Sequence, residues 1–174
     1  MKLLITALTG LLLASNVFAE SISVGQLAPN FKLADQQNKF LQLSDLRGQW
    51  VVLYFYPKDQ TPGCTKEACN FRDNISGIKA KNAVVLGVSV DDNESHSAFA
   101  EKHDLPFKLL SDTDGKIAEQ YGALRNLWVT KIAKRHSFII DPEGKIAKIY
   151  RKVSPASHVG EIVSDLDELQ SNTD

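Results

Sequence analysis

The stretch that decides the fold is residues 50–69, which read Trp-Val-Val-Leu-Tyr-Phe-Tyr, then Pro-Lys-Asp-Gln-Thr-Pro-Gly-Cys, then Thr-Lys-Glu-Ala-Cys. Its first seven residues are apolar without interruption, and most are β-branched or aromatic, which is typical of a strand buried on both faces. A turn with two prolines follows, and the composition then favours a helix from about Cys64 to Lys81. A buried strand, a tight turn and a helix in direct succession predict an α/β fold.

The rest of the chain continues this alternation of strands and helices. Further strands are expected at 83–90, 137–140 and 146–150, and helices at 94–104, 116–121 and 157–169. Asp114 or Ser111 is available to cap the helix that begins at residue 116. Residues 31–33 and 40–43 form a candidate hairpin ahead of the first buried strand. The expected architecture is a central mixed sheet flanked by helices, with an N-terminal β-hairpin extension.

Length and composition exclude several classes of protein. The 174 residues suit one domain, and 43% hydrophobic with 24% charged residues is typical of a folded globular chain. The 20 basic and 21 acidic residues give no electrostatic reason to bind nucleic acid or an anionic membrane. Two cysteines are too few for a four-cysteine metal site or a disulfide-rich scaffold.

The first nineteen residues have the layout of a secretory signal. Lys2 precedes an apolar run, and the small residues Val17 and Ala19 stand before a cut at Glu20. We therefore expect a signal peptide at 1–19, one domain at 20–174, and a location in the periplasm or outside the cell, where disulfides persist. A permanent anchor is the weaker alternative, because a spanning helix needs roughly 20 apolar residues and no basic stop-transfer cluster follows.

The position of Cys64 favours a reactive thiol. It follows the first buried strand and stands in the first turn of the expected helix, where unpaired backbone N–H groups and the helix dipole favour the thiolate. The alternative is an inert thiol in the core, since most cysteines are small buried hydrophobes. The prolines, the glycine and the threonine of the preceding turn make core burial the weaker interpretation.

The spacing between Cys64 and Cys69 adds a second argument. Residues five apart in one intact helix lie about 140° apart around the axis, with Cα atoms roughly 8 to 9 Å from each other. A disulfide needs a Cα separation below about 7 Å, so a bond between the two cysteines requires local unwinding. That requirement suits a catalytic cycle better than a permanent structural disulfide, which stays open as the alternative.

Three residues in this region carry a resemblance to a known family. Pro57, Thr61 and Cys64 match the peroxiredoxin signature in type and spacing, and the Thr-Lys-Glu-Ala-Cys run is similar to the bacterioferritin comigratory protein or peroxiredoxin Q branch. The resemblance implies a thioredoxin-like fold and thiol-dependent peroxide reduction. It also implies that Cys64 is the peroxidatic cysteine, Cys69 the resolving cysteine, and Arg135 the active-site arginine.

The resemblance further implies the substrates and partners. Hydrogen peroxide and organic hydroperoxides would be bound by Pro57, Thr61, Gly63 and Arg135, and a thioredoxin-like dithiol would recycle the enzyme. No cofactor or metal is expected, and this branch is often monomeric. One departure concerns residues 121–135, a segment shorter than in many members and without their glycine-containing loop.

Other residues and functions stay open as alternatives. Lys58, Asp59 and Glu67 are expected to be solvated or ion-paired groups that hold the loop, and the four histidines lack zinc-ligand spacing. A thiol-disulfide oxidoreductase acting on proteins is a second functional hypothesis, which the absence of a Cys-x-x-Cys motif disfavours. A noncatalytic thioredoxin-fold binding module is the third.

Overall fold

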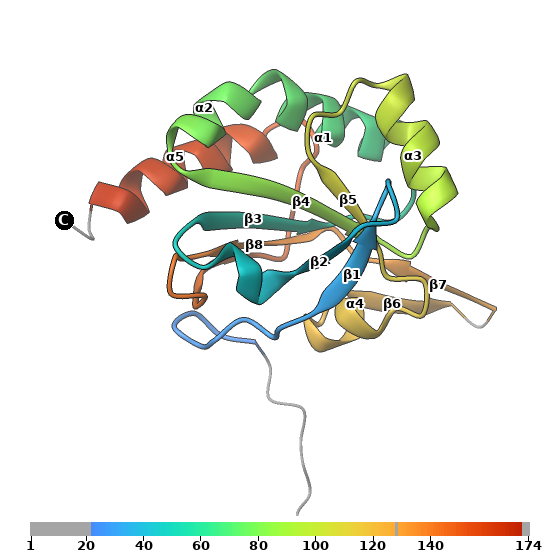
Figure 1. Cartoon of the computed structure of the whole chain (residues 1–174), viewed down its shortest axis with the longest axis horizontal. Coiled ribbons are helices and arrows are strands. Elements are labelled where there is room, and N and C mark those ends of the chain that lie inside the picture. Colours follow the sequence, from blue (N-terminus) through green and yellow to red (C-terminus); the bar gives the residue numbers. More distant parts are fainter. Residues whose placement is uncertain (1–21, 128, 172–174) are drawn as a thin grey trace, which may run out of the picture.

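A seven-stranded mixed sheet forms the centre of the molecule in the computed structural model, which describes residues 22–127 and 129–171 (Figure 1). The strand order is β2-β1-β5-β4-β3-β8-β9. Strands β3, β4 and β5 are parallel, and the remaining pairs are antiparallel. The bounds are β1 (Lys32–Asp35), β2 (Phe40–Gln42), β3 (Trp50–Phe55), β4 (Ala83–Ser89), β5 (Lys108–Ser111), β8 (His136–Ile140) and β9 (Ile146–Tyr150).

Helices cover both faces of the sheet, and most of them lie on one side (Figure 1). That side carries α1 (Pro62–Asp73), α2 (Ile75–Ala80), α3 (Asn93–Lys102) and α5 (His158–Ser171). The other side carries α4 (Lys116–Gln120) and the short 3-10 helix η1 (Leu43–Leu46). All six residues of β3 are buried, because alternate side chains such as Tyr54 and Leu53 point into the two opposite cores. The α/β architecture predicted from the sequence is confirmed.

The long helix expected from Cys64 to Lys81 is in fact two helices. Helix α1 ends at Asp73, and α2 begins at Ile75. Between them, the Asn74 side chain donates a hydrogen bond to the carbonyl of Asn70 at 2.9 Å. Asparagine side chains compete in this way with helical backbone bonds, which accounts for the break. Both cysteines lie in α1.

The start of α4 also differs from the sequence-based expectation. Its N-cap residue is Gly115, in a left-handed conformation and with no side chain to cap the helix. The carboxylate of Asp112, rather than Ser111, accepts the backbone N–H groups of Ile117 and Ala118 at 3.1 and 2.8 Å. The predicted role of Asp114 is correct in part, since it accepts the N–H of Lys116 at 3.0 Å.

The predicted N-terminal hairpin is present as β1 and β2, and β1 also pairs with β5, so the hairpin extends the main sheet. A second hairpin, β6 (Leu124–Leu127) and β7 (Thr130–Ala133), forms a separate two-stranded sheet. It lies within residues 121–135, the segment identified from the sequence as shorter than in many peroxiredoxins. Among the described residues, no helix is long and apolar enough to cross a membrane. The predicted signal, residues 1–19, lies outside the described part of the chain.

Candidate active site

The pairing of β3 with β8 brings together two segments that are far apart in the sequence. The two strands are antiparallel, and Phe55 at the end of β3 lies opposite His136 at the start of β8. The residue before His136 is therefore placed beside the turn that follows β3. That residue is Arg135, and the turn leads directly into α1. The carboxyl ends of β3 and β4 meet at this same edge because those strands are parallel.

Cys64 lies in the first turn of α1, as the sequence predicts. Thr61 is the N-cap residue and Pro62 the first helical residue, so the helix begins where proline's missing N–H costs nothing. The expectation that the preceding turn keeps Cys64 out of the core is wrong, because only 1% of the residue is exposed and it packs in the core. Arg135 Nη2 donates a hydrogen bond to Cys64 Sγ at 3.1 Å. The positive guanidinium and the helix N-terminus both favour negative charge on this sulfur.

Glu67 is the second partner of Arg135. Arg135 Nη1 donates to Glu67 Oε2 at 2.6 Å, and the carboxylate is buried one helical turn beyond Cys64. Burial raises the pKa of Glu67 to about 7, because desolvation outweighs the opposing effect of Arg135. The guanidinium is thus held in a fork between the sulfur and the carboxylate. The sequence-based expectation of a solvated or ion-paired Glu67 is confirmed in its second form, and the i+3 spacing from Cys64 was a signal that the pair would lie at the site.

Gly63 makes room for this arginine. A Cβ atom at residue 63 would stand 2.9 Å from Arg135 Nη2 and 3.8 Å from Pro155 Cγ. Contacts under 3.0 Å force a neighbour to move, and here the neighbour is the group that reaches Cys64. Glycine at residue 63 therefore lets the guanidinium approach the helix closely without being displaced.

The remaining predicted residues lie in the turn between β3 and α1. Pro57 lies two residues after the end of β3 and is partly buried. The Thr61 hydroxyl is partly buried and donates to the carbonyl oxygen of Lys58 at 3.0 Å. With its hydrogen used in this way, the hydroxyl oxygen keeps lone pairs that can accept a further hydrogen bond. The side chain of Lys58 is exposed, whereas Asp59 is buried.

Cys69 lies further along the same helix and is partly buried, and both cysteines are free thiols. Helix α1 is continuous from Pro62 to Asp73, so both cysteines sit in one intact helix. The geometric argument made from the sequence therefore applies: a bond between the two sulfurs requires α1 to unwind locally. Among the described residues, no group of three or more His, Cys, Asp or Glu side chains is arranged to hold a metal ion.

Fold and site together define a class of protein. A buried cysteine in the first turn of the helix that follows β3 of a mixed α/β sheet, with an arginine donating to its sulfur, is suited to thiolate chemistry. The class is that of cysteine-dependent redox enzymes with a thioredoxin-like fold.

Comparisons with known proteins identify the family within this class. Residues 24–149 match the model of the AhpC/TSA family. The chain is 48% identical over 150 residues to the putative peroxiredoxin bcp of Coxiella burnetii, covering 84% of this chain and 99% of that protein. It is 42% identical over 157 residues to peroxiredoxin Bcp of Bacillus subtilis, covering 86% and 98%. The chain belongs to the AhpC/TSA family, and it is a thiol peroxidase similar to the Bcp and peroxiredoxin Q enzymes.

Solved structures agree with the fold. Peroxidoxin BcpB from Mycobacterium tuberculosis superposes with a TM-score of 0.80 at 35% identity, covering 84% of this chain and 97% of that one. A cysteine-to-serine mutant of PrxQ from Xylella fastidiosa gives a TM-score of 0.79 at 30% identity, covering 89% and 99%. The predicted thioredoxin-like fold is therefore confirmed.

Proposed function

We propose that Cys64 is the peroxidatic cysteine and reduces a peroxide by direct attack of its thiolate. The sulfur attacks one peroxide oxygen, the O–O bond breaks, and the second oxygen leaves as water or an alcohol after taking up a proton. Cys64 is oxidised to a sulfenic acid in this step. The observation that carries the proposal is the 3.1 Å hydrogen bond from Arg135 to Cys64 Sγ at the start of α1.

Arg135 and Thr61 supply the polar contacts that this step needs. Negative charge develops on the departing oxygen, and donors aimed at it stabilise the transition state. The guanidinium offers several fixed N–H donors, and the backbone N–H groups of Gly63 and Cys64 at the helix start add others. The Thr61 hydroxyl, which donates to Lys58, accepts the hydrogen of the peroxide. Pro57 carries no N–H and shapes the approach to the sulfur.

Cys69 is proposed as the resolving cysteine. Its thiol condenses with the Cys64 sulfenic acid, water leaves, and an intramolecular disulfide forms once α1 unwinds locally. A thioredoxin-like dithiol then reduces this disulfide and becomes oxidised in turn. Cys69 lies on the same helix and needs no second subunit, which supports a monomer as the working unit.

The substrates proposed are hydrogen peroxide and organic hydroperoxides. A solved relative, the bacterioferritin comigratory protein of Xanthomonas campestris, is described as having alkyl peroxide reduction activity, and that chain superposes with a TM-score of 0.77 at 29% identity. Exchange with protein disulfides is the competing function. Enzymes of that kind usually carry a Cys-x-x-Cys motif, and the spacing of Cys64 and Cys69 does not match it.

The test is a single turnover of the reduced protein with one equivalent of hydrogen peroxide, followed by thiol trapping and mass spectrometry. Wild type should form a Cys64–Cys69 disulfide rapidly. Cys64→Ser should be inert, and Cys69→Ser should stop at the sulfenic acid or a higher oxide. Wild-type thiols that react no faster than free cysteine would overturn the proposal.

The export of the enzyme is part of the same proposal. It rests on the signal-like composition of residues 1–19, with its basic start, apolar run and small residues. Expression of the full chain in a bacterial host, followed by fractionation and N-terminal sequencing, should find a periplasmic protein beginning at Glu20. An uncleaved protein in the cytoplasmic fraction would contradict it.

A further inference from the structure

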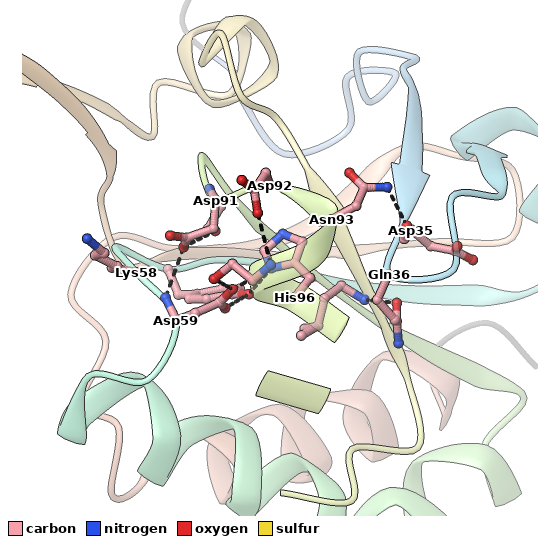
Figure 2. Close-up of polar contacts among 12 residues, drawn as sticks. Asp35, Gln36, Lys58, Asp59, Asp91, Asp92, Asn93 and His96 are labelled. Atoms are coloured by element: carbon pink, nitrogen blue, oxygen red, sulfur yellow. Dashed lines mark hydrogen bonds and ion pairs between the residues drawn. The ribbon is translucent and has the colours of Figure 1, made fainter. Parts of the chain in front are cut away.

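A buried polar cluster holds the turn ahead of Cys64, and the thiol chemistry described above makes no use of it. Its centre is Asp59, which is only 4% exposed (Figure 2). The carboxylate accepts hydrogen bonds from Tyr56 Oη at 2.7 Å and Ser95 Oγ at 2.8 Å, and His96 Nδ1 lies 2.8 Å from it. A buried carboxylate with this many partners is fixed in position.

His96 donates the hydrogen in its contact with Asp59. It is fully buried, and its Nδ1 also lies 3.3 Å from Tyr56 Oη. Because the Asp59 carboxylate is an acceptor, we assign the hydrogen to Nδ1. Both Ser95 and His96 belong to the first turn of α3, which Asp92 caps through the N–H of Ser95 at 2.9 Å.

The backbone of Asp59 is held as well as its side chain. Its N–H donates to Asp91 Oδ2 at 2.9 Å, and Asp91 in turn accepts from Ser89 Oγ at 2.7 Å. The turn after β3 is therefore tied both to the segment after β4 and to α3. Gln60, the next residue, has a φ of 60°, a conformation that costs energy for a residue other than glycine. The contacts of Asp59 offset that strain.

This cluster connects directly to the proposed peroxide site. Lys58, whose carbonyl accepts the Thr61 hydroxyl at 3.0 Å, is the neighbour of Asp59. Thr61 also begins α1, since its carbonyl accepts the N–H of Thr65 at 2.9 Å. Any shift of the Lys58–Asp59 peptide therefore changes where the Thr61 hydroxyl points relative to Cys64.

We propose that Asp59 is a positioning residue for peroxide reduction: held by Tyr56, Ser95 and His96, it fixes the Lys58 carbonyl and through it the Thr61 hydroxyl. The inference rests on the proposed roles of Cys64 and Thr61. Misplacement of a reacting group by about 1 Å can lower a rate on the order of a hundredfold. Loss of the cluster therefore slows reaction with peroxide but leaves the intrinsic reactivity of the thiol in place.

The experiment compares two reactions of Cys64 in the reduced full chain. One is oxidation by hydrogen peroxide, and the other is alkylation by iodoacetamide, which needs a thiolate but no bound peroxide. Asp59→Asn should slow the peroxide reaction about 10-fold to 100-fold and change alkylation by less than about twofold. The matched control is Asp35→Asn, another fully buried carboxylate, which accepts the N–H groups of Gln37 and Lys39 and pairs with Lys108. It should leave both rates near wild type.

A double-mutant cycle tests whether Asp59 acts through Thr61. In a Thr61→Val background, Asp59→Asn should slow the peroxide reaction by less than about twofold more. The inference would be overturned if the rate reductions of Asp59→Asn and Thr61→Val multiplied fully in the double variant. It would also be overturned if Asp59→Asn slowed both reactions equally, or if its peroxide rate stayed within twofold of wild type. Should Asp59→Asn fail to fold, Ser95→Ala removes one donor and should show the same selectivity at a few-fold level. A wild-type protein inert to peroxide would instead reject the proposed function itself.

Discussion

The two ends of helix α1 are held in different ways. At the N-terminal end, Arg135 joins the buried Cys64 and the buried Glu67 through charged hydrogen bonds. At the C-terminal end, Cys69 is only partly buried, and the helix stops at Asp73. In the mechanism proposed above, the first end would hold the reacting sulfur in place, and the second would release Cys69 for disulfide formation.

The polar contacts at the C-terminal end are individually weak. Asn70 Nδ2 donates to the carbonyl of Pro155 at 2.9 Å, and Arg72 Nη1 donates to the carbonyl of His103 at 2.8 Å. Arg72 also pairs with Asp73 at the surface. A partly buried bond such as that of Asn70 contributes roughly 1 kcal/mol to stability, and surface pairs such as Arg72–Asp73 contribute little. The larger contact at this end is Phe71, which is fully buried and stacks on Tyr54 with 4.7 Å between ring centroids, so unwinding around Cys69 costs least if Phe71 stays in the core.

The largest expected effect comes from Arg135→Lys. An ammonium group cannot reproduce the fork that serves Cys64 and Glu67 together, so the rate of peroxide reaction should fall about 10²-fold to 10³-fold. Stopped-flow or quenched-flow oxidation of reduced protein measures this. Arg72→Lys, the same exchange at the other end of α1, should change the rate by less than about twofold. Equal effects of the two substitutions would remove the distinction between the ends.

Glu67→Gln should change how stability depends on pH. Burial raises the pKa of Glu67 to about 7 from an ordinary 4.5, so the folded state keeps a proton that the unfolded state has lost between these values. Wild type therefore loses stability as pH rises from 4.5 to 7, by on the order of 3 kcal/mol. Urea denaturation at pH 4.5, 6 and 8 should show that the free energy of unfolding of Glu67→Gln, relative to that of wild type, increases with pH. A constant difference between the two proteins would contradict the raised pKa.

The two ends also differ in how far the sequence could predict them. The unbroken apolar run of β3 and the turn before Cys64 were sufficient to place the strand, the helix start and the thiol. The sequence did not predict the break at Asn74. The composition up to Lys81 is compatible with one helix, and it does not reveal the bond from the Asn74 side chain to the Asn70 carbonyl. Glu67 was expected as a solvated or ion-paired residue, and the ion pair with Arg135 confirms the second form.

Contacts over long sequence separations were the hardest to foresee. Asp59 and His96 are 37 positions apart and meet only because β3 and β4 are parallel neighbours whose following loops share one edge. Arg135 could be assigned from the family resemblance. Its fork with Glu67, by contrast, depends on the antiparallel register of β3 with β8. The local periodicity of the sequence predicts strands but not their order in the sheet, so these contacts could be found only in the structure.

Gly63→Ala should have an intermediate effect. The added Cβ would meet Arg135 Nη2 at 2.9 Å and displace it from Cys64, so the peroxide reaction should slow about tenfold. Gly77→Ala in α2 is the matched control, because nothing lies within 4 Å of a Cβ there. That change should leave the rate unaltered and raise stability by about 0.5 kcal/mol. Measured rates for the two variants that agree within twofold would show that Gly63 does not need to be glycine.

The smallest effect is expected at the far end of α1, from Asn70→Ala. Loss of its bond to Pro155 should lower the free energy of unfolding by about 1 kcal/mol and make unwinding around Cys69 easier. Disulfide formation after peroxide oxidation should then speed up about twofold to fivefold, while the first oxidation keeps its wild-type rate. Rapid chemical quenching with mass spectrometry separates the two steps. Gln170→Ala, which loses a comparable bond to Lys81 away from α1, should change neither step. If Asn70→Ala slows disulfide formation, unwinding at this end is not what limits it.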